Sequence, residues 1–195
     1  MKEYDVIVCG GGIAGISAAL ASSRMGQKVC LIERNALIGG LSTSGLIHWY
    51  EPLCDGLGHQ LINSNAEELL RYAIKYGYHT LEDSWLYKNN DKHETRYATW
   101  FDPNLFALSL TNLLSNENVD IYFESQISEV HVINNLISKI DIYTIEGVEK
   151  VEIVSSYSAT LISETSYIIS PVYLLENNSS YFPAINEHPG LNIDK

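Results

Sequence analysis

YDVIVCGGGIAG, residues 4–15, is the stretch that predicts the fold of this 195-residue chain. Its first half, residues 4–9, is a short apolar run rich in β-branched residues, which is typical of a strand buried in a parallel sheet. Its second half contains Gly10, Gly12 and Gly15, which satisfy the pattern G-x-G-x-x-G. A glycine-rich turn directly after a buried strand predicts a nucleotide-binding loop.

The residues that follow complete a strand–helix–strand unit. Residues 13–25 have a face of small side chains and predict a helix, which Gly26 is well placed to end. Residues 28–32, KVCLI, predict the second strand, and Glu33 follows it, 23 positions after Gly10. Strand, glycines, helix, strand and acid occur in this order within about thirty residues, so we predict a dinucleotide site.

The first residues of this unit have separate physical tasks in such a site. Gly10 permits the tight turn out of the strand, Gly12 lets the backbone approach a pyrophosphate, and Gly15 lets the helix pack closely on the sheet. The free N–H groups at the helix start, where Ile13 and Ala14 lie, favour phosphate together with the positive end of the helix dipole. All five residues are therefore candidate cofactor contacts.

Glu33 and the loop after it bear on which dinucleotide is bound. Glu33 would accept hydrogen bonds from ribose hydroxyls, and its charge disfavours a 2′-phosphate. Residues 33–45 predict an extended loop with a second glycine pair, Gly39 and Gly40, where a simple NAD domain would turn quickly into its next helix. The loop favours FAD over NAD. An ordinary glycine turn between strand and helix is the alternative.

Three further blocks carry a resemblance to a known family: residues 39–62 (GGLSTSGLIHWYEPLCDGLGHQLI), 66–77 and 96–114. They are similar to the FAD-dependent oxidoreductase family related to the flavin subunit of heterodisulfide reductases, and the similarity extends over about residues 4–144. It implies FAD binding and redox chemistry without identifying a substrate.

The loop after Glu33 resembles the loop by which flavoproteins of the glutathione-reductase-like class hold the rest of the FAD. By that resemblance Gly39 and Gly40 lie near the pyrophosphate or the ribityl chain, and Thr43 and Ser44 point towards the flavin. Arg34 belongs to the same set of candidate cofactor contacts.

An iron–sulfur cluster is suggested only by the wider family, whose members can carry a 4Fe–4S cluster. Cys9, Cys30 and Cys54 are widely spaced and do not provide the usual four ligands. FAD is therefore the one cofactor that we predict.

The middle of the chain predicts two helices and three strands. The helices are expected at residues 66–76 and 103–114, the second with Asp102 as its N-cap. The strands are expected at residues 119–124, 127–132 and 136–143, the last two around an Asn134–Asn135 turn. This resembles the return of the chain to the nucleotide domain, where a strand passes beside the adenine. By that resemblance Ile127 is a candidate adenine contact.

We therefore expect an α/β fold: a Rossmann-like FAD-binding domain with a parallel sheet and a β-meander, interrupted by a small helical or irregular cap. The ADP-binding unit spans residues 1–47, the cap or substrate-side insertion 48–101, and the return to the FAD-binding domain 102–147. Residues 148–195 form a divergent tail, in which residues 158–161 (SATL) lack the glycine and acid of the family's Ala-Thr-Gly-Asp-like turn. This pattern predicts an incomplete domain, the N-terminal portion of a longer flavoprotein.

No residue can be identified from the sequence as an essential catalytic acid or base. His48 and His59 lie in the block expected near the flavin and are candidates for proton transfer. Arg96 is a candidate anchor for a carboxylate substrate. The alternatives are simple hydrogen bonding for the histidines and a surface position for the arginine. The six histidines show no H-x-x-x-H or comparable spacing, so no metal site is predicted.

Charge narrows the function further. The chain contains 24 Asp and Glu residues and 12 Lys and Arg residues, so its net charge is −12. Such a surface repels nucleic acids and anionic membranes, and no apolar run is long enough to cross a bilayer. We expect a cytoplasmic FAD-dependent oxidoreductase whose substrate or redox partner is unknown. The alternative is a non-catalytic fragment that keeps the ADP cradle but cannot hold FAD productively.

Overall fold

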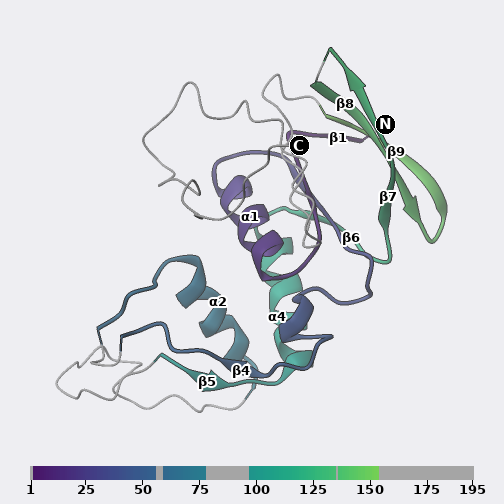
Figure 1. Ribbon diagram of the computed structural model, residues 1–195. Coiled ribbons are helices and arrows are strands. Elements are labelled where there is room, and N and C mark those ends of the chain that lie inside the picture. The colour runs from purple at the N-terminus through teal and green to yellow at the C-terminus, as the bar shows by residue number, and fades with distance from the viewer. Residues whose placement is uncertain (1, 56–58, 78–96, 135, 154–195) are drawn as a thin grey trace, which may run out of the picture.

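The structure, a computed structural model, describes residues 2–55, 59–77, 97–134 and 136–153 (Figure 1). At its centre lies a parallel sheet of three strands in the order β2-β3-β6. These strands are β2 (Val6–Cys9), β3 (Val29–Ile32) and β6 (Asp120–Tyr122). All four residues of the middle strand β3 are buried, which agrees with the apolar run from which the strand was predicted.

Two helices cover one face of the parallel sheet, α1 (Ile13–Arg24) and α4 (Pro103–Asn116). A third, α2 (Asn65–Ile74), packs on α4. α1 packs on β2 and β3, and α4 packs on α1, α2 and β6. The core between the helices and this face of the sheet includes Val8, Ile16, Leu20, Leu31, Leu70, Phe106 and Leu110.

A second sheet covers the opposite face, in the order β1-β9-β8-β7. Its strands are β1 (Lys2–Tyr4), β7 (Gln126–Ile133), β8 (Leu136–Thr144) and β9 (Gly147–Ile153). β7, β8 and β9 form an antiparallel meander, while β1 pairs parallel to β9. A second core joins the two sheets through Tyr4, Ile7, Cys30, Ile32, Ile140, Ile142 and Val151. Alternate residues of β2 and β3 thus serve two different cores.

The predicted strand at residues 4–9 is in fact two strands, which is a correction to the sequence analysis. The break is at Asp5, whose backbone N–H donates to the Lys28 carbonyl at 2.8 Å. The Lys28 N–H in turn donates to the Asp5 carboxylate at 2.8 Å. Tyr4 therefore ends β1 in the outer sheet, and Val6 begins β2 in the parallel sheet. The apolar pattern hides the break because both strands bury side chains.

Two predicted helix ends are confirmed. Gly26 directly follows the C-cap of α1, Met25, and has a positive φ of 82°. Asp102 is the N-cap of α4, since its side chain accepts hydrogen bonds from the backbone of Asn104 and Leu105, both at 2.9 Å. The meander strands at residues 127–132 and 136–143 are also found, as β7 and β8.

Strand β9 was not predicted. Residues 148–153, assigned above to a divergent tail, pair with β8 on one side and, in part, with β1 on the other. Lys150 and Glu152 obscure the strand in the sequence, because a sheet with one solvent-facing side needs apolar residues on the other side only. The rest of the predicted tail, with residues 158–161, lies outside the described residues.

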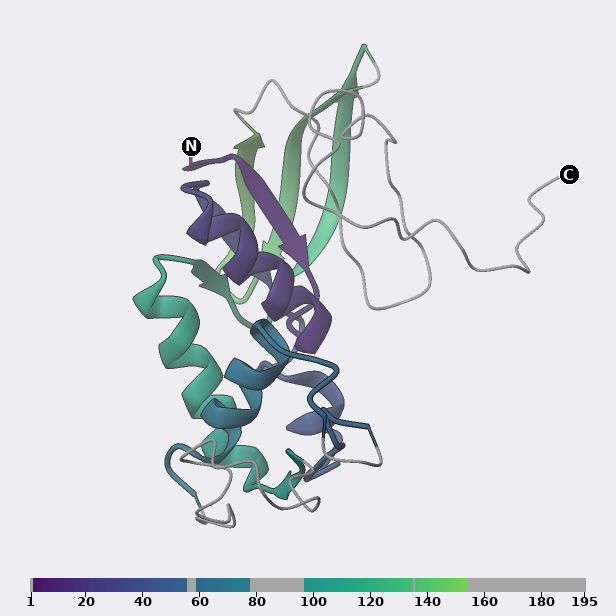
Figure 2. The same ribbon diagram turned by 90° about the vertical axis from the view of Figure 1, so that its left-hand side faces the viewer.

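The cap contains α2 and a small antiparallel pair, β4 (Trp49–Tyr50) and β5 (Thr99–Trp100). It lies at the opposite end of the molecule from the meander (Figures 1 and 2). Arg24 of α1 links the cap to the core. Its guanidinium donates two hydrogen bonds of 2.7 Å to Glu68 of α2. It donates two more, of 2.7 and 2.9 Å, to Glu117, which follows α4. Within the described residues, no helix is long and apolar enough to span a membrane.

Replacing Arg24 tests this fastening. Arg24→Met removes the charge that joins α1, α2 and α4, and we expect the free energy of unfolding to fall by about 1 kcal/mol because the groups are partly exposed. Hydrogen bonding to Arg24 lowers the pKa of Glu68. The stabilisation is therefore present at neutral pH and is lost as the pH falls through this lowered pKa. Urea unfolding of both proteins at neutral and acid pH measures the difference.

The control is Glu146→Gln, an exposed change in the turn between β8 and β9 that should leave stability unaltered. An effect of Arg24→Met that is as large in acid as at neutral pH would show that the ion pairs do not carry it.

Candidate functional site

Glu33 lies at the end of β3 and is 5% exposed. Its carboxylate accepts a hydrogen bond from the Gly11 N–H and another from the Asn35 N–H, both at 2.7 Å. A carboxylate can accept about four hydrogen bonds, so acceptor positions remain for further donors such as ribose hydroxyls. Glu33 therefore fixes the first glycine loop to the loop after β3 and keeps the capacity that the sequence analysis assigned to it.

The second glycine loop is attached directly to the first. The Gly39 N–H donates to the Gly11 carbonyl at 2.6 Å. A Cβ at Gly11 would lie 2.7 Å from Ile38 Cγ2 and 3.0 Å from the Glu33 carboxylate, so any larger residue would have to displace one of these side chains. Gly11 was not a predicted site residue, because the fingerprint leaves this position open. The signal that could have found it is the third consecutive glycine.

The first turn of α1 is built to accept an anion. Gly12 is its N-cap and provides no side-chain hydrogen bond, and the turn contains no acidic residue. Since the first N–H groups of a helix have no intrahelical partner, they remain available to a phosphate. Gly15 has the close approach expected of it, because a Cβ there would lie 1.9 Å from the Gly10 carbonyl oxygen.

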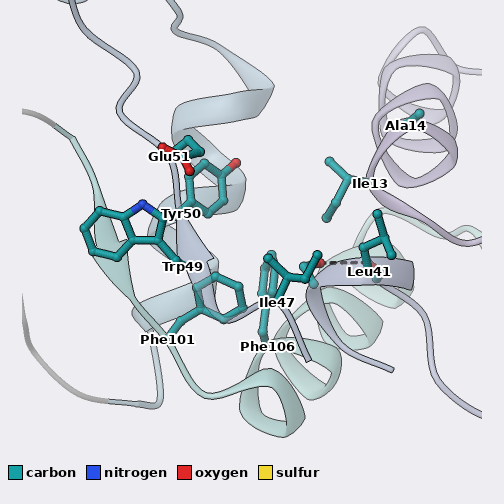
Figure 3. Close-up of a pocket in the computed structure, with 11 residues that line it drawn as sticks. Ile13, Ala14, Leu41, Ile47, Trp49, Tyr50, Glu51, Phe101 and Phe106 are labelled. Atoms are coloured by element: carbon teal, nitrogen blue, oxygen red, sulfur yellow. Dashed lines mark hydrogen bonds between the residues drawn. The ribbon is translucent and has the colours of Figure 1, made fainter. Parts of the chain in front are cut away.

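A cavity of about 660 Å³ begins at this turn (Figure 3). Ile13 and Ala14 form one wall, and Trp49, Tyr50 and Glu51 approach from the other side. The full lining among the described residues is Ile13, Ala14, Gly39, Leu41, Ser42, Ile47, Trp49, Tyr50, Glu51, Phe101 and Phe106. The cavity therefore connects the helix start, the second glycine loop and the cap.

Only some of the predicted cofactor residues line this cavity: Ile13, Ala14 and Gly39. Gly40 begins the short 3₁₀ turn η1 (Gly40–Ser42) beside it. Thr43 is 2% exposed and its hydroxyl donates to the Ile38 carbonyl at 2.7 Å, so it holds the loop together from inside. Ser42, which was not predicted, lines the cavity instead.

The remaining predicted cofactor contacts lie elsewhere. Arg34 and Ser44 are exposed and are not among the described lining residues. Ile127 lies on β7 and packs against the core between the two sheets. Its place beside an adenine stays a prediction.

Of the catalytic candidates, neither described histidine belongs to the lining. His48 is exposed, its Nδ1 lies 3.0 Å from the Leu46 carbonyl oxygen, and its ring is 5.0 Å from that of Trp100. The side chain of His59 is 74% exposed and its Nδ1 lies 2.8 Å from the Asp55 carboxylate. Arg96 lies outside the described residues.

The cap side of the cavity is aromatic. The rings of Tyr50 and Phe101 are 6.3 Å apart, those of Phe101 and Phe106 are 5.0 Å apart, and Trp49 lies 4.9 Å from Trp100. Burial raises the pKa of Tyr50 to about 12, so its hydroxyl, which donates to the Ala66 carbonyl, stays protonated at neutral pH. We name Trp49, Tyr50, Phe101 and Phe106 the aromatic wall. It can exclude water from whatever the cavity holds.

Cys9 and Cys30 lie in neighbouring strands, away from the cavity lining. Burial raises the pKa of the Cys9 thiol to about 12 and that of Cys30 further still. With no metal bound, both remain thiols at neutral pH.

Comparison with known proteins places this geometry among flavoproteins. Residues 5–158 match the model of a protein family described as FAD dependent oxidoreductase. A tRNA uridine 5-carboxymethylaminomethyl modification enzyme, MnmG, of Buchnera aphidicola subsp. Cinara cedri is 30% identical over 183 residues, which cover 88% of this chain and 26% of the enzyme. A soluble pyridine nucleotide transhydrogenase of Mycobacterium bovis is 44% identical over 41 residues, 21% of this chain and 9% of that protein. The chain thus spans about a quarter, or less, of each relative's length.

Solved structures share the fold. A geranylgeranyl bacteriochlorophyll reductase-like protein of Thermoplasma acidophilum superposes with a TM-score of 0.52 at 19% sequence identity. The match covers 84% of this chain and 39% of the length of that protein. The L-amino acid deaminase of Proteus vulgaris has a TM-score of 0.52 at 15% identity, over 84% of this chain and 48% of its own. The α/β architecture predicted from the sequence is confirmed.

Gly11 provides a test of the cradle. In Gly11→Ala the new methyl group must displace Ile38 or Glu33, and we expect the affinity for ADP to fall at least about tenfold. Isothermal titration with ADP measures this, and circular dichroism checks that the variant is folded. Gly77→Ala is the matched control, since its Cβ would meet only ordinary contacts at 3.9 Å. Equal ADP affinity in all three proteins would contradict the role given to Gly11.

Proposed function

Because this chain belongs to the FAD-dependent oxidoreductase family, we propose that it binds FAD along the cavity and provides the cofactor site of a flavin-dependent oxidoreductase. The observation that carries the proposal is the hydrogen bond of 2.6 Å between the Gly39 N–H and the Gly11 carbonyl. It holds the second glycine loop, whose Gly39 lines the cavity, against the first, which leads into the lining residues Ile13 and Ala14. A nucleotide and the group attached to it can then lie in one continuous path.

The residues along this path suit the successive parts of FAD. The first turn of α1, from Gly12 to Ala14, offers N–H groups to the pyrophosphate. Glu33 accepts from the ribose of the adenosine half, and the loop from Gly39 to Ser42 borders the ribityl chain. Ile127 on β7 is the proposed adenine contact.

FAD supplies two-electron chemistry when bound, and the chain supplies position and surroundings. The aromatic wall excludes water from the far end of the cavity. Glu51 brings one carboxylate to that end, and it is the charged member of the described lining. His48, next to Trp100 at the edge of the wall, is the candidate for proton transfer.

Within the family we propose a relationship to the flavin subunit of heterodisulfide reductases, supported by residues 39–62, 66–77 and 96–114. The substrate is proposed to be a small molecule or a redox partner in the cytoplasm. A net charge of −12 disfavours a polynucleotide, so the tRNA in the name of the MnmG relative is not extended to this chain.

A visible spectrum of the purified chain separates this proposal from its alternatives. We expect flavin absorbance, either as purified or after reconstitution with FAD. A colourless protein that binds ADP but cannot be loaded with FAD would instead support a non-catalytic fragment. Tight NAD binding without flavin would support an NAD module.

Glu33→Gln sharpens the test. Glutamine keeps the shape of the side chain but turns an NH₂ group towards one of the two amides that the carboxylate binds. Hydrogen bonds to a charged group contribute about 1.5–3 kcal/mol, so we expect FAD affinity to fall about tenfold to a hundredfold. Flavin fluorescence quenching measures the dissociation constant. Glu146→Gln, an exposed change, serves as the control, and unaltered binding in Glu33→Gln would refute the assigned role.

A further inference from the structure

Three side chains with metal-binding atoms converge on the hairpin of β7 and β8. Glu129 and His131 come from β7, and Asp141 comes from β8. His131 Nε2 lies 3.2 Å from Asp141 Oδ1 and 3.8 Å from Glu129 Oε2. All three possible ligand atoms lie within 4.8 Å of one another. This cluster is on the outer sheet, at the other end of the molecule from the cap that borders the cavity (Figures 1 and 2).

The spacing of these atoms fits the ligands of one metal ion. Zn²⁺ binds imidazole nitrogen and carboxylate oxygen at about 2.0–2.2 Å in tetrahedral geometry, which places two ligand atoms about 3.4 Å apart. The two separations from His131 Nε2, 3.2 and 3.8 Å, lie on either side of that value. Small side-chain rotations would bring all three atoms to one ion.

Two of the atoms are buried without a hydrogen-bond partner among the described residues: His131 Nε2 and Asp141 Oδ1. Asp141 as a whole is only 8% exposed. Buried polar atoms nearly always have a hydrogen-bond partner, because burying a polar atom without one destabilises the folded chain. The 3.2 Å separation between the two atoms is an ion-pair distance without hydrogen-bond alignment. A ligand that both can bind would remove this cost.

The strand register adds a second argument. Glu129 lies directly opposite Asp141, and like charges in that relation destabilise a sheet. The pairing of β7 with β8 is irregular on both sides of the cluster, between Ile127 and Glu129 and between His131 and Val132. Irregularities of this kind re-aim side chains. Here they accompany the convergence of two carboxylates and an imidazole.

Lysines already supply some positive charge. Lys139 Nζ lies 3.5 Å from Asp141 Oδ1, and Lys150 on β9 is opposite Asp141. A single ammonium group offsets one carboxylate, whereas a divalent ion offsets both and also accepts the imidazole lone pair. The side chain of Lys139 is 24% exposed, so its ammonium group can move to water when an ion binds.

We propose that Glu129, His131 and Asp141 bind a divalent transition-metal ion of the Zn²⁺ class, with the fourth position taken by water. The ion links β7 to β8 and stabilises the outer sheet. None of the three ligands is among the described residues that line the cavity.

Zinc titration of the full chain tests the proposal. The chain is freed of metal with a chelator and titrated with zinc chloride in a calorimeter, and we expect one ion to bind per chain. Glu129→Gln and His131→Gln should each weaken binding at least about tenfold. Zinc should raise the melting temperature of the parent chain but not of these two variants. Glu129 is exposed, so its variant tests the site without endangering the fold.

The matched control is His59→Gln, which removes another His–Asp pair of the described residues, His59 with Asp55, and should leave zinc binding unchanged. Lys139→Met removes the competing ammonium and should tighten zinc binding severalfold. No saturable binding, or binding that survives both Glu129→Gln and His131→Gln, overturns the proposal. So does loss of the binding in His59→Gln alone.

Discussion

The buried carboxylate of Glu33 is the constraint on which the nucleotide-binding half of the structure depends. Burying an unpaired charge is costly unless hydrogen bonds compensate for it, and here they come from the backbone of Gly11 and Asn35. The backbone of Glu33 is used as well: its N–H donates to the Tyr122 carbonyl and its carbonyl accepts from Ser125. One residue thus joins β3 to β6 and orders the loops that follow β2 and β3.

The start of the chain could be predicted from sequence because its structure depends on local patterns, whereas other parts depend on tertiary pairing. The strand, helix and second strand of residues 6–32 are set by local patterns, and the caps at Asp102 and Gly26 by local chemistry. The break at Asp5 and the strand β9 depend on which sheet each segment joins. Such choices are made by tertiary pairing, which single-strand patterns do not contain.

The same distinction applies to the site. Ile13 and Ala14 were predicted from the helix start of the fingerprint and Gly39 from the resemblance of the later loop, and all three line the cavity. Thr43 was expected towards the flavin, yet its hydroxyl is bound to Ile38 and its neighbour Ser42 lines the cavity instead. A difference of one residue in a loop depends on the exact path of a 3₁₀ turn. Across the β7–β8 hairpin, Glu129 and Asp141 become neighbours only through the register.

The second glycine loop bears on whether the chain holds a whole dinucleotide or only its ADP half. An ADP cradle requires the first turn of α1 and Glu33, and nothing beyond them. Here the cavity extends from Ile13 and Ala14 in the first turn of α1, along Gly39, Leu41 and Ser42, to the aromatic wall. Ile38, behind this loop, is completely buried in the core shared by the helices and the sheet. A loop whose base is part of the core is held in one position, and this position places Gly39 and Ser42 in the cavity lining. The alternative of a cradle for ADP alone leaves this extension without a purpose.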